Sequence, residues 1–199
     1  MYLAAAGIGA IDIWDDDHVD RSNLQRQVQF GEPDIDQPKA ELLAERLRAQ
    51  NKALSVTAHT ARFEAGATPS GNILIDATDN YQARFALNAL AHKTARPMIH
   101  GAAARWTGQV SVFASGLEGA APCYQCWVPE EPPAPEACED VGVAGPVTGI
   151  VATHMALETL KLITGAGRTL TGKLLLFDGL SGVSRQIALR KDLACPICS

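Results

Sequence analysis

Apolar and polar residues follow one another along the chain in two distinct ways, and this pattern predicts most of its strands and helices. Short apolar runs bounded by polar residues are typical of buried strands, whereas apolar residues three and four positions apart indicate helices. Leu42, Leu43 and Leu47 have the helical spacing, in a segment that begins near Pro38 and ends near Asn51. Strands are predicted at residues 10–14, 54–59, 72–77, 97–100, 109–114, 174–177 and 183–189, and further helices at 1–6, 81–94 and 148–163.

The order of these elements predicts an α/β fold. Strands alternate with helices in the first half, which is typical of right-handed βαβ units and of a doubly wound, Rossmann-like, mainly parallel sheet. The later strands follow one another closely, so we expect an antiparallel C-terminal portion. Residues 120–146 are rich in Pro, Glu, Cys and Gly and lack periodicity, which predicts an irregular loop segment within a single domain over residues 1–199.

The first residues are unusual for such a fold. A doubly wound nucleotide-binding fold normally opens with a strand and a glycine loop that leads into a helix. This chain begins inside what reads as the end of that helix, with Gly7 and Gly9 terminating it. We therefore expect the domain to be incomplete at its N-terminus, with the first strand and glycine loop absent.

Composition narrows the class of protein. Hydrophobic residues make up 47% of the chain and charged residues 20%, and the formal net charge is −5. The negative charge argues against a general binder of nucleic acid or anionic membranes. No apolar run approaches the roughly 20 residues that span a bilayer, and the apolar start lacks the basic residues of a targeting signal. We expect a cytoplasmic protein.

Five cysteines carry the strongest chemical signal. The pairs Cys123-x-x-Cys126 and Cys195-x-x-Cys198 supply four thiolates, which predicts a tetrahedral structural Zn²⁺ site. A redox role for a CxxC pair is the alternative, although no thioredoxin-like pattern accompanies it. Cys138 remains outside both pairs in a glycine-containing stretch, where it is either a nucleophile toward an activated acyl group or an unreactive thiol.

Several polar residues occupy positions that suit a nucleotide. Asp15 ends the first strand, where an acid accepts hydrogen bonds from ribose hydroxyls, although an acidic loop start is the commoner explanation of such a residue taken alone. Arg26 lies among uncharged amides, and its guanidinium suits phosphate or a surface salt bridge. Lys39 lies in the first turn of its helix, where a phosphate would offset the unfavourable helix dipole and where a solvated lysine is also common.

A second acidic group follows the predicted strand at 72–77. Asp76 and Asp79 lie at its carboxyl end, the edge at which ligands bind in parallel sheets. A carboxylate there suits Mg²⁺ or the phosphate side of a nucleotide. Asp79 or Asn80 is also a candidate cap for the following helix, and both roles are compatible.

Taken together, the sequence resembles the ThiF/MoeB/HesA family of ubiquitin-activating-enzyme-like adenylyltransferases. The matching stretches occur in family order along nearly the whole chain: DDDHVDRSNLQRQVQF, DIDQPKAELLAERLRAQN, DATDN, PCYQC, CEDVGVAGPVTGIVATHMALETLKLITG, LLLFDG and CPIC. The triple aspartate, DIDQPK and LLLFDG favour the thiamine-pathway branch. The glycine loop, its strand and an arginine acting across a homodimer are expected ahead of residue 1.

The resemblance implies a role for each candidate residue. It assigns Asp15 to the ribose and Lys39 to the ATP phosphates, and it implicates Asp79 in Mg²⁺ binding and catalysis, with Asn80 beside it. The SNLQR stretch also contacts the phosphates, through Ser22, Asn23, Leu24, Gln25 and Arg26. The four paired cysteines bind zinc, and Cys138 corresponds to a cysteine of thioester or acyl-disulfide chemistry. The implied catalytic set is Arg26, Lys39, Asp79 and Cys138.

The expected activity is ATP-dependent adenylylation of the C-terminal glycine carboxylate of a small ubiquitin-like sulfur carrier, for thiamine biosynthesis. The expected partners are that carrier, of ThiS or MoaD type, and a sulfurtransferase. A molybdopterin-pathway adenylyltransferase is the nearest alternative. A non-catalytic remnant that binds a partner or dimerises is another, because the glycine loop is missing, and an in-frame GxGGxG upstream of Met1 would favour the enzyme. A dinucleotide-dependent oxidoreductase shares the general fold, but no glycine fingerprint or substrate-domain pattern is present.

Overall fold

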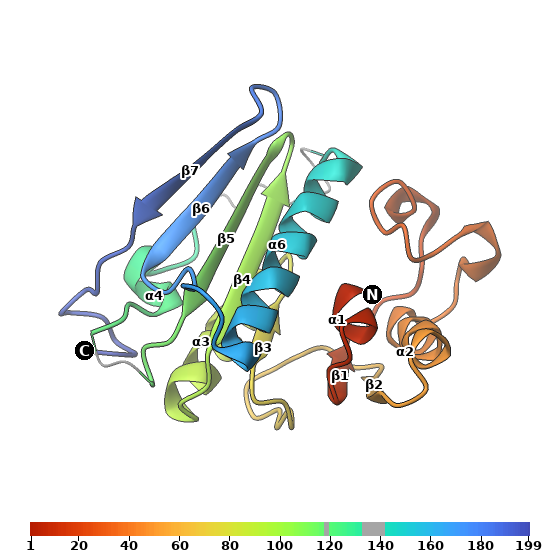
Figure 1. Cartoon of the computed structure of the whole chain (residues 1–199), viewed down its shortest axis with the longest axis horizontal. Coiled ribbons are helices and arrows are strands. Elements are labelled where there is room, and N and C mark those ends of the chain that lie inside the picture. Colours follow the sequence, from red (N-terminus) through yellow and green to blue (C-terminus); the bar gives the residue numbers. More distant parts are fainter. Residues whose placement is uncertain (118–119, 133–141) are drawn as a thin grey trace. The chain divides into compact units, whose positions relative to one another are not determined.

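A computed structural model describes residues 1–117, 120–132 and 142–199 of the chain. It divides into two compact units, Met1–Gly71 and Asn72–Ser199. Each unit is described by itself below, and the elements of both are labelled in Figure 1.

The first unit is built on a parallel β-α-β crossover. Its elements are α1 (Tyr2–Ala5), β1 (Ala10–Trp14), the short 3-10 helices η1 (Arg21–Asn23) and η2 (Glu32–Asp34), α2 (Lys39–Gln50) and β2 (Ser55–His59). Strands β1 and β2 are parallel, with Ala10 opposite Ser55 and Trp14 opposite His59. The core joins Ala4 of α1 and the apolar face of α2 to β2, through Ala44, Leu47, Leu54 and Val56. This core orients the carboxyl end of β1, from which the candidate nucleotide-binding loop departs.

The second unit contains a five-stranded mixed sheet. Its elements are β3 (Leu74–Asp76), α3 (Tyr81–Lys93), β4 (Met98–Ala104), β5 (Thr107–Phe113), α4 (Tyr124–Trp127), α6 (Gly145–Thr164), β6 (Lys173–Asp178) and β7 (Val183–Ala188). The strand order is β3-β4-β5-β6-β7. Strands β3 and β4 are parallel, and the three later pairings are antiparallel.

Helix α6 packs on one face of this sheet, and strand alternation defines both faces (Figure 1). Val110 and Val112 of β5 form a buried cluster with Val151 and Met155 of α6. Gly101 lies on the same face, because a Cβ there would collide with the side chain of Met155. The intervening residues of each strand therefore point to the opposite face, where the pocket described below lies.

The ends of α6 follow from its sequence. Pro146 lies in its first turn, where its fixed φ is compatible with a helix and its missing N–H is not needed. Gly165 follows the last turn with a φ of 69°, and its N–H bonds to the Lys161 carbonyl at 2.8 Å. A left-handed glycine is a common helix terminator, so the predicted helix at 148–163 is confirmed and extended.

The remaining expectations are met unevenly. The predicted strands and long helices are present, with ends displaced by a few residues. The expected antiparallel C-terminal portion is confirmed, since the β4–β5, β5–β6 and β6–β7 pairings are antiparallel. With β3–β4 as its one parallel pairing, the sheet of the second unit is mixed and not mainly parallel as predicted. The irregular segment at 120–146 contains α4, too short to show a helical period.

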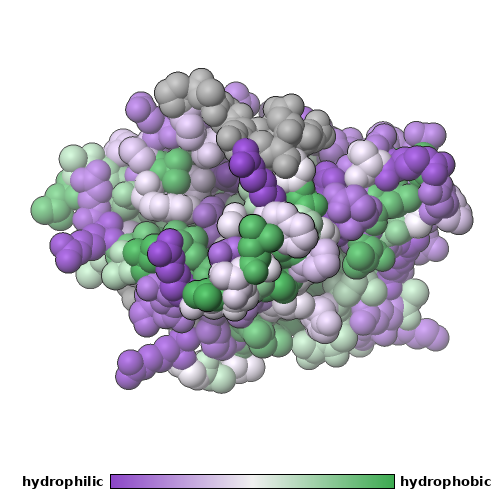
Figure 2. Space-filling model, turned by 90° about the horizontal axis from the view of Figure 1, so that it is seen from above, coloured by the Kyte–Doolittle hydropathy of each residue, from purple (hydrophilic) through white to green (hydrophobic). Residues whose placement is uncertain are grey.

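No helix in the described part of the chain is long and apolar enough to cross a membrane. On the face shown in Figure 2, hydrophilic residues surround small hydrophobic patches.

Candidate functional site

Asp15 begins a loop directly after β1, as predicted. Its Oδ1 accepts a hydrogen bond from the Asp17 backbone N–H at 2.9 Å. Burial raises the pKa of Asp15 above its ordinary value. The carboxylates of Asp15, Asp16 and Asp17 lie within 4.8 Å of one another. Asp15 is the half-buried member of this group, so it is the least mobile acceptor that the loop offers.

Lys39 is the first residue of α2 and is buried, with only 7% of its surface exposed. Its Nζ donates to Asp17 Oδ2 at 2.9 Å, and its backbone N–H donates to the Asp17 carbonyl at 3.0 Å. The carboxylate therefore supplies the negative charge that a cation at a helix N-terminus requires. Because Asp17 is 60% exposed at its side chain, an anionic ligand could compete for the ammonium group.

The SNLQR stretch forms η1 and the turn after it. Asp20 caps this short helix, with its Oδ1 accepting from the Ser22 N–H at 2.7 Å. The Arg26 guanidinium donates to the Ser22 carbonyl at 3.2 Å. Asn23 is buried beneath the turn. The stretch is therefore a hydrogen-bonded turn that carries Arg26, and the sequence period gave no indication of it.

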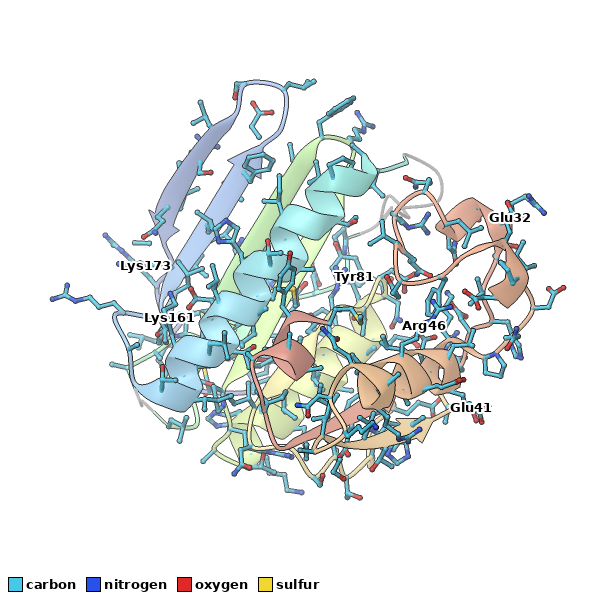
Figure 3. The ribbon with its side chains drawn as sticks, turned by 45° about the vertical axis from the view of Figure 1, so that its right-hand side comes forward. Glu32, Glu41, Arg46, Tyr81, Lys161 and Lys173 are labelled. Carbon is cyan, nitrogen blue, oxygen red and sulfur yellow. The ribbon has the colours of Figure 1, made fainter. Side chains whose placement is uncertain are left out.

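The loop between β1 and α2 is held in place by its own backbone and by α2. The Val19 N–H donates to Gln37, and the Asp36 N–H donates to Val19, each at 2.9 Å. Asp34 accepts from Gly31 N at 2.7 Å and from Arg46 of α2 at 2.5 Å. The hydrogen bond from Arg46, labelled in Figure 3, lowers the pKa of Asp34. The predicted nucleotide-binding residues of this unit thus stand on a fixed loop.

In the second unit, the predicted acidic segment follows β3 and opens α3. Asn80 is the helix cap, because its side chain accepts from the Ala83 N–H at 2.8 Å. Of the two candidate caps, the structure therefore selects Asn80, and the exposed Asp79 lines a pocket instead. Asp76 is fully buried beneath this turn and accepts from the N–H and hydroxyl of Thr78.

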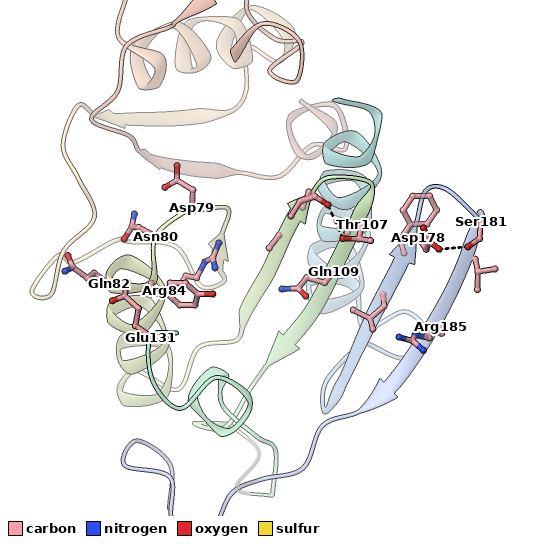
Figure 4. A pocket seen from close by; sticks show the side chains of 18 residues that line it. Asp79, Asn80, Gln82, Arg84, Thr107, Gln109, Glu131, Asp178, Ser181 and Arg185 are labelled. Atoms are coloured by element: carbon pink, nitrogen blue, oxygen red, sulfur yellow. Dashed lines mark hydrogen bonds between the residues drawn. The ribbon is translucent and has the colours of Figure 1, made fainter. Parts of the chain in front are cut away.

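The pocket has a volume of about 950 Å³ and lies on the sheet face opposite α6 (Figure 4). Its lining combines apolar residues of the sheet, such as Ala102 and Leu176, with both signs of charge. Charged and amide side chains come from α3, β5, β6 and β7 and from the segments before α3 and after α4: Asp79, Gln82, Arg84, Gln109, Glu131, Asp178 and Arg185. The volume is at the upper end of the range for small-molecule sites, roughly 300–1,000 Å³.

Arg84 is the buried cation of this pocket. Its Nη2 donates to the Thr78 carbonyl at 2.7 Å, and the guanidinium lies 5.1 Å from the Tyr81 ring centre. Among the described residues, its buried Nε has no hydrogen-bond partner. A buried donor without a partner is costly, so the guanidinium is suited to an anionic or carbonyl-bearing ligand.

The four paired cysteines converge, as the sequence predicted, although 68 residues separate the two pairs. Neighbouring sulfurs are 3.3 Å (Cys126–Cys198), 3.5 Å (Cys123–Cys195) and 3.9 Å (Cys123–Cys126) apart. Thiolates about 2.3 Å from a tetrahedral zinc have sulfurs about 3.8 Å apart. All four are free thiols, so the residues fit a metal site made of four cysteines.

Asn88 of α3 contacts the cysteine cluster and the helix that carries Cys126. It is buried, and its Oδ1 accepts from the Tyr124 N–H at 2.8 Å while its Nδ2 lies 3.6 Å from the Cys123 sulfur. Burial raises the pKa of Cys123 to about 11, so a metal must displace the thiol proton at neutral pH. Amide donors near a ligating sulfur orient it and stabilise its charge.

Sequence reasoning missed part of the pocket and could not place one predicted residue. Arg84 lies four positions after Asn80 on a helix, so helical spacing alone could have placed it beside the acidic segment. Gln109 and Arg185 depend on strand register, which the sequence does not display. Cys138 lies outside the described residues.

Comparison with known proteins identifies the family. The chain matches the ThiF family over residues 1–197. It is 38% identical over 202 residues to the sulfur carrier protein ThiS adenylyltransferase of Escherichia coli K12, covering 100% of this chain and 79% of that protein. It is also 38% identical over 205 residues to the adenylyltransferase and sulfurtransferase MOCS3 of Caenorhabditis briggsae, covering 99% of this chain.

This chain spans only 50% of the MOCS3 protein. Among solved structures, E. coli MccB with MccA-N7isoASN is 20% identical, with a TM-score of 0.86 over 99% of this chain and 61% of that one. That likeness concerns the fold. The sequence matches extend over practically the whole chain and include the acidic, SNLQR and CxxC segments described above; the chain therefore belongs to the ThiF family.

Proposed function

We propose that this protein catalyses ATP-dependent adenylylation of the C-terminal glycine carboxylate of a small ubiquitin-like sulfur carrier. The observation that carries the proposal is the 38% identity, over the full length of this chain, to a sulfur carrier adenylyltransferase. A carboxylate oxygen attacks the α-phosphorus of ATP, a P–O bond to the leaving group breaks, and pyrophosphate is released. The products are the acyl-adenylate and pyrophosphate.

The residues of each unit have defined roles in this proposal. Asp15 accepts hydrogen bonds from the ribose, and Ser22–Arg26 and Lys39 bind the phosphates. Lys39 exchanges its ion pair with Asp17 for one with phosphate, which the exposure of Asp17 permits. Catalysis then rests on positioning and on neutralising charge that develops on the phosphates.

Two metals accompany the proposed activity. Asp79, an exposed carboxylate in the pocket wall, with Asn80 beside it, suits Mg²⁺, which proteins bind through one or two carboxylates together with substrate phosphates. Bound Mg²⁺ would neutralise phosphate charge. Zn²⁺ held by Cys123, Cys126, Cys195 and Cys198 would be structural, since a closed set of four thiolates leaves no open coordination position.

After adenylylation, sulfur must reach the carrier. We assign the later step to Cys138 in concert with a sulfurtransferase. Its thiol attacks the acyl carbon of the adenylate, the bond to AMP breaks, and a thioester forms; sulfide-level sulfur delivered by the sulfurtransferase then displaces the thiol and leaves a thiocarboxylate on the carrier. We also propose a cytoplasmic homodimer. The thiamine pathway is the proposed context, because DIDQPK and LLLFDG favour that branch. The identity of 38% is the same for relatives named for ThiS and for MOCS3, so a MoaD-type carrier of the molybdopterin pathway is the second candidate.

ATP–pyrophosphate exchange with candidate carriers tests the proposal. The assay should use this chain and a version extended by the translated sequence upstream of Met1. Exchange should require a carrier with a free C-terminal glycine carboxylate, and the same carrier amidated at that glycine should be inactive. Exchange with a ThiS-type but not a MoaD-type carrier supports the thiamine assignment. Absence of exchange with both carriers, in both forms of the protein, refutes the enzyme and favours a non-catalytic remnant.

A further inference from the structure

A buried, hydrogen-bonded pair of side chains lies directly behind the pocket wall. Asp76 of β3 and His100 of β4 are opposite one another in the parallel register, and both are fully buried. Their Oδ2 and Nδ1 atoms are 2.6 Å apart. The other carboxylate oxygen accepts from Thr78 N at 3.0 Å and from Thr78 Oγ1 at 2.7 Å. Burial opposes the charge of Asp76, but the hydrogen bond from His100 and those from Thr78 outweigh it and lower the pKa.

These contacts determine which ring nitrogen of His100 donates a hydrogen bond. An ionised carboxylate only accepts hydrogen bonds, so Nδ1 of His100 must carry a proton toward Asp76. In the neutral ring, Nε2 is then an acceptor. Nε2 of His100 lies 3.4 Å from Nε2 of Gln109 on β5. The amide group of Gln109 is therefore the donor, and its orientation follows from the proton on the opposite side of the ring.

Aromatic side chains enclose the imidazole and fix its plane. The ring centres of Tyr124, Trp127 and Phe113 lie 5.0, 5.9 and 6.4 Å from that of His100. Both ring nitrogens of His100 thus have a polar partner, and the ring is packed among aromatic side chains.

Gln109 contacts His100 and also lines the pocket. It lies on the pocket face of β5, opposite Ala102 of β4 and Leu176 of β6, and all three line the cavity (Figure 4). With its amide N–H₂ directed to His100, Gln109 offers Oε1 as an acceptor. Among the described residues, Oε1 of Gln109 accepts no hydrogen bond. The wall therefore presents a fixed acceptor flanked by apolar residues.

We propose that His100, oriented by Asp76, is a positioning residue that fixes Gln109 to accept a backbone N–H of an extended peptide in this pocket. Apolar strips beside a side-chain acceptor suit a peptide chain, whose N–H groups recur along its length. The inference rests on the proposed function for the origin of the peptide, the C-terminal tail of the carrier. It adds a pair of residues, His100 and Gln109, that would bind the tail on the N-terminal side of its carboxylate.

Amide-to-ester substitution in a synthetic peptide tests the contact directly. The probe is the C-terminal segment of the carrier, ending in glycine with a free carboxylate, in a series that replaces one backbone N–H at a time by an ester oxygen. One member should bind the wild-type protein about fivefold more weakly than the parent, as expected for one hydrogen bond. In Gln109→Leu that difference should disappear, whereas Gln186→Leu, a control on the other face of the sheet, should retain it.

His100→Asn tests the positioning role. The shorter amide can still donate to Asp76 but offers no acceptor at the Nε2 position, so the ester difference should shrink to less than twofold although the protein remains folded. In the wild type, ¹⁵N NMR of the imidazole should show a neutral ring protonated on Nδ1 at pH 7. A proton on Nε2, an imidazolium, an unbound parent peptide or an ester series without a weakened member would each overturn the inference. Ester discrimination without pyrophosphate exchange would contradict only the proposed function, and exchange without discrimination only this inference.

Discussion

At the scale of single residues, Lys39 combines a buried position with an exposed partner. Lys39→Met removes the charge and keeps most of the side-chain volume. Because the pair with Asp17 is partly solvated, its loss should cost about 1 kcal/mol or less in unfolding free energy. Loss of a phosphate contact in the transition state should lower pyrophosphate exchange by about 100-fold or more.

The control for this prediction is Lys52→Met, which changes an exposed lysine after the end of α2. That variant should exchange pyrophosphate at the wild-type rate. Exchange near the wild-type rate in Lys39→Met, measured on protein with an unchanged melting temperature, would remove Lys39 from the phosphate site.

Asp76 makes the stability of the second unit depend on pH. Its folded pKa is lower than its ordinary value of about 3.9, so its contribution to stability is present above that value and is lost as the pH falls below it. Asp76→Asn should lower the unfolding free energy at pH 7 by about 3 kcal/mol, since it removes a buried charged acceptor of the hydrogen bonds from His100 and Thr78. In urea titrations the difference from wild type should shrink below about pH 4. A difference that stays constant with pH would mean that Asp76 is neutral in the folded protein.

At the scale of elements, the long strands and helices were predictable because their apolar spacing is regular. The β4–β5 hairpin was not fully predictable. Arg105 occupies its turn with a φ of 53°, so the glycine or asparagine signal of a tight turn is missing. The sequence reading consequently ended the first of these strands at residue 100 and began the next at 109, four and two residues short of the observed ends.

The same limitation explains which site residues were missed. Asp15, Lys39 and Asp79 stand at element ends, where position along the chain indicates a role. His100 and Gln109 are related only through the register of β3, β4 and β5. Two CxxC pairs have a fixed metal chemistry, so their meeting was predictable across 68 residues.

The packing of α6 on β4 gives a test with opposite outcomes at two glycines. A Cβ at Gly101 would collide with the Met155 side chain, whereas one at Gly149, on the exposed side of α6, meets no atom within 4 Å. Gly101→Ala should therefore destabilise by about 1–3 kcal/mol. Gly149→Ala should stabilise by up to about 1 kcal/mol, because alanine favours a helix. Urea denaturation measures both, and equal effects would contradict this packing.

At the scale of the whole molecule, the cysteine cluster joins the C-terminus to α4 within the second unit. The purified protein should contain about one Zn²⁺ per chain, and Cys195→Ser should abolish binding. Chelation should lower the melting temperature, because metal-binding free energy contributes to folding. Cys138→Ser is the control and should keep its zinc, since Cys138 belongs to neither pair. Metal analysis that finds no zinc, or zinc unaffected by Cys195→Ser, would refute the site.

The central claim is that the carrier receives the adenylyl group of ATP, and phosphorus labelling tests it most directly. The protein, alone and with its upstream extension, is incubated with carrier and with ATP labelled at the α- or the γ-phosphate. Our account predicts that label from the α-phosphate, and none from the γ-phosphate, appears on the carrier and is released as AMP by hydroxylamine, which cleaves acyl-adenylates. Transfer of the γ-phosphate, or a carrier that stays unlabelled with both forms of the protein, would contradict it.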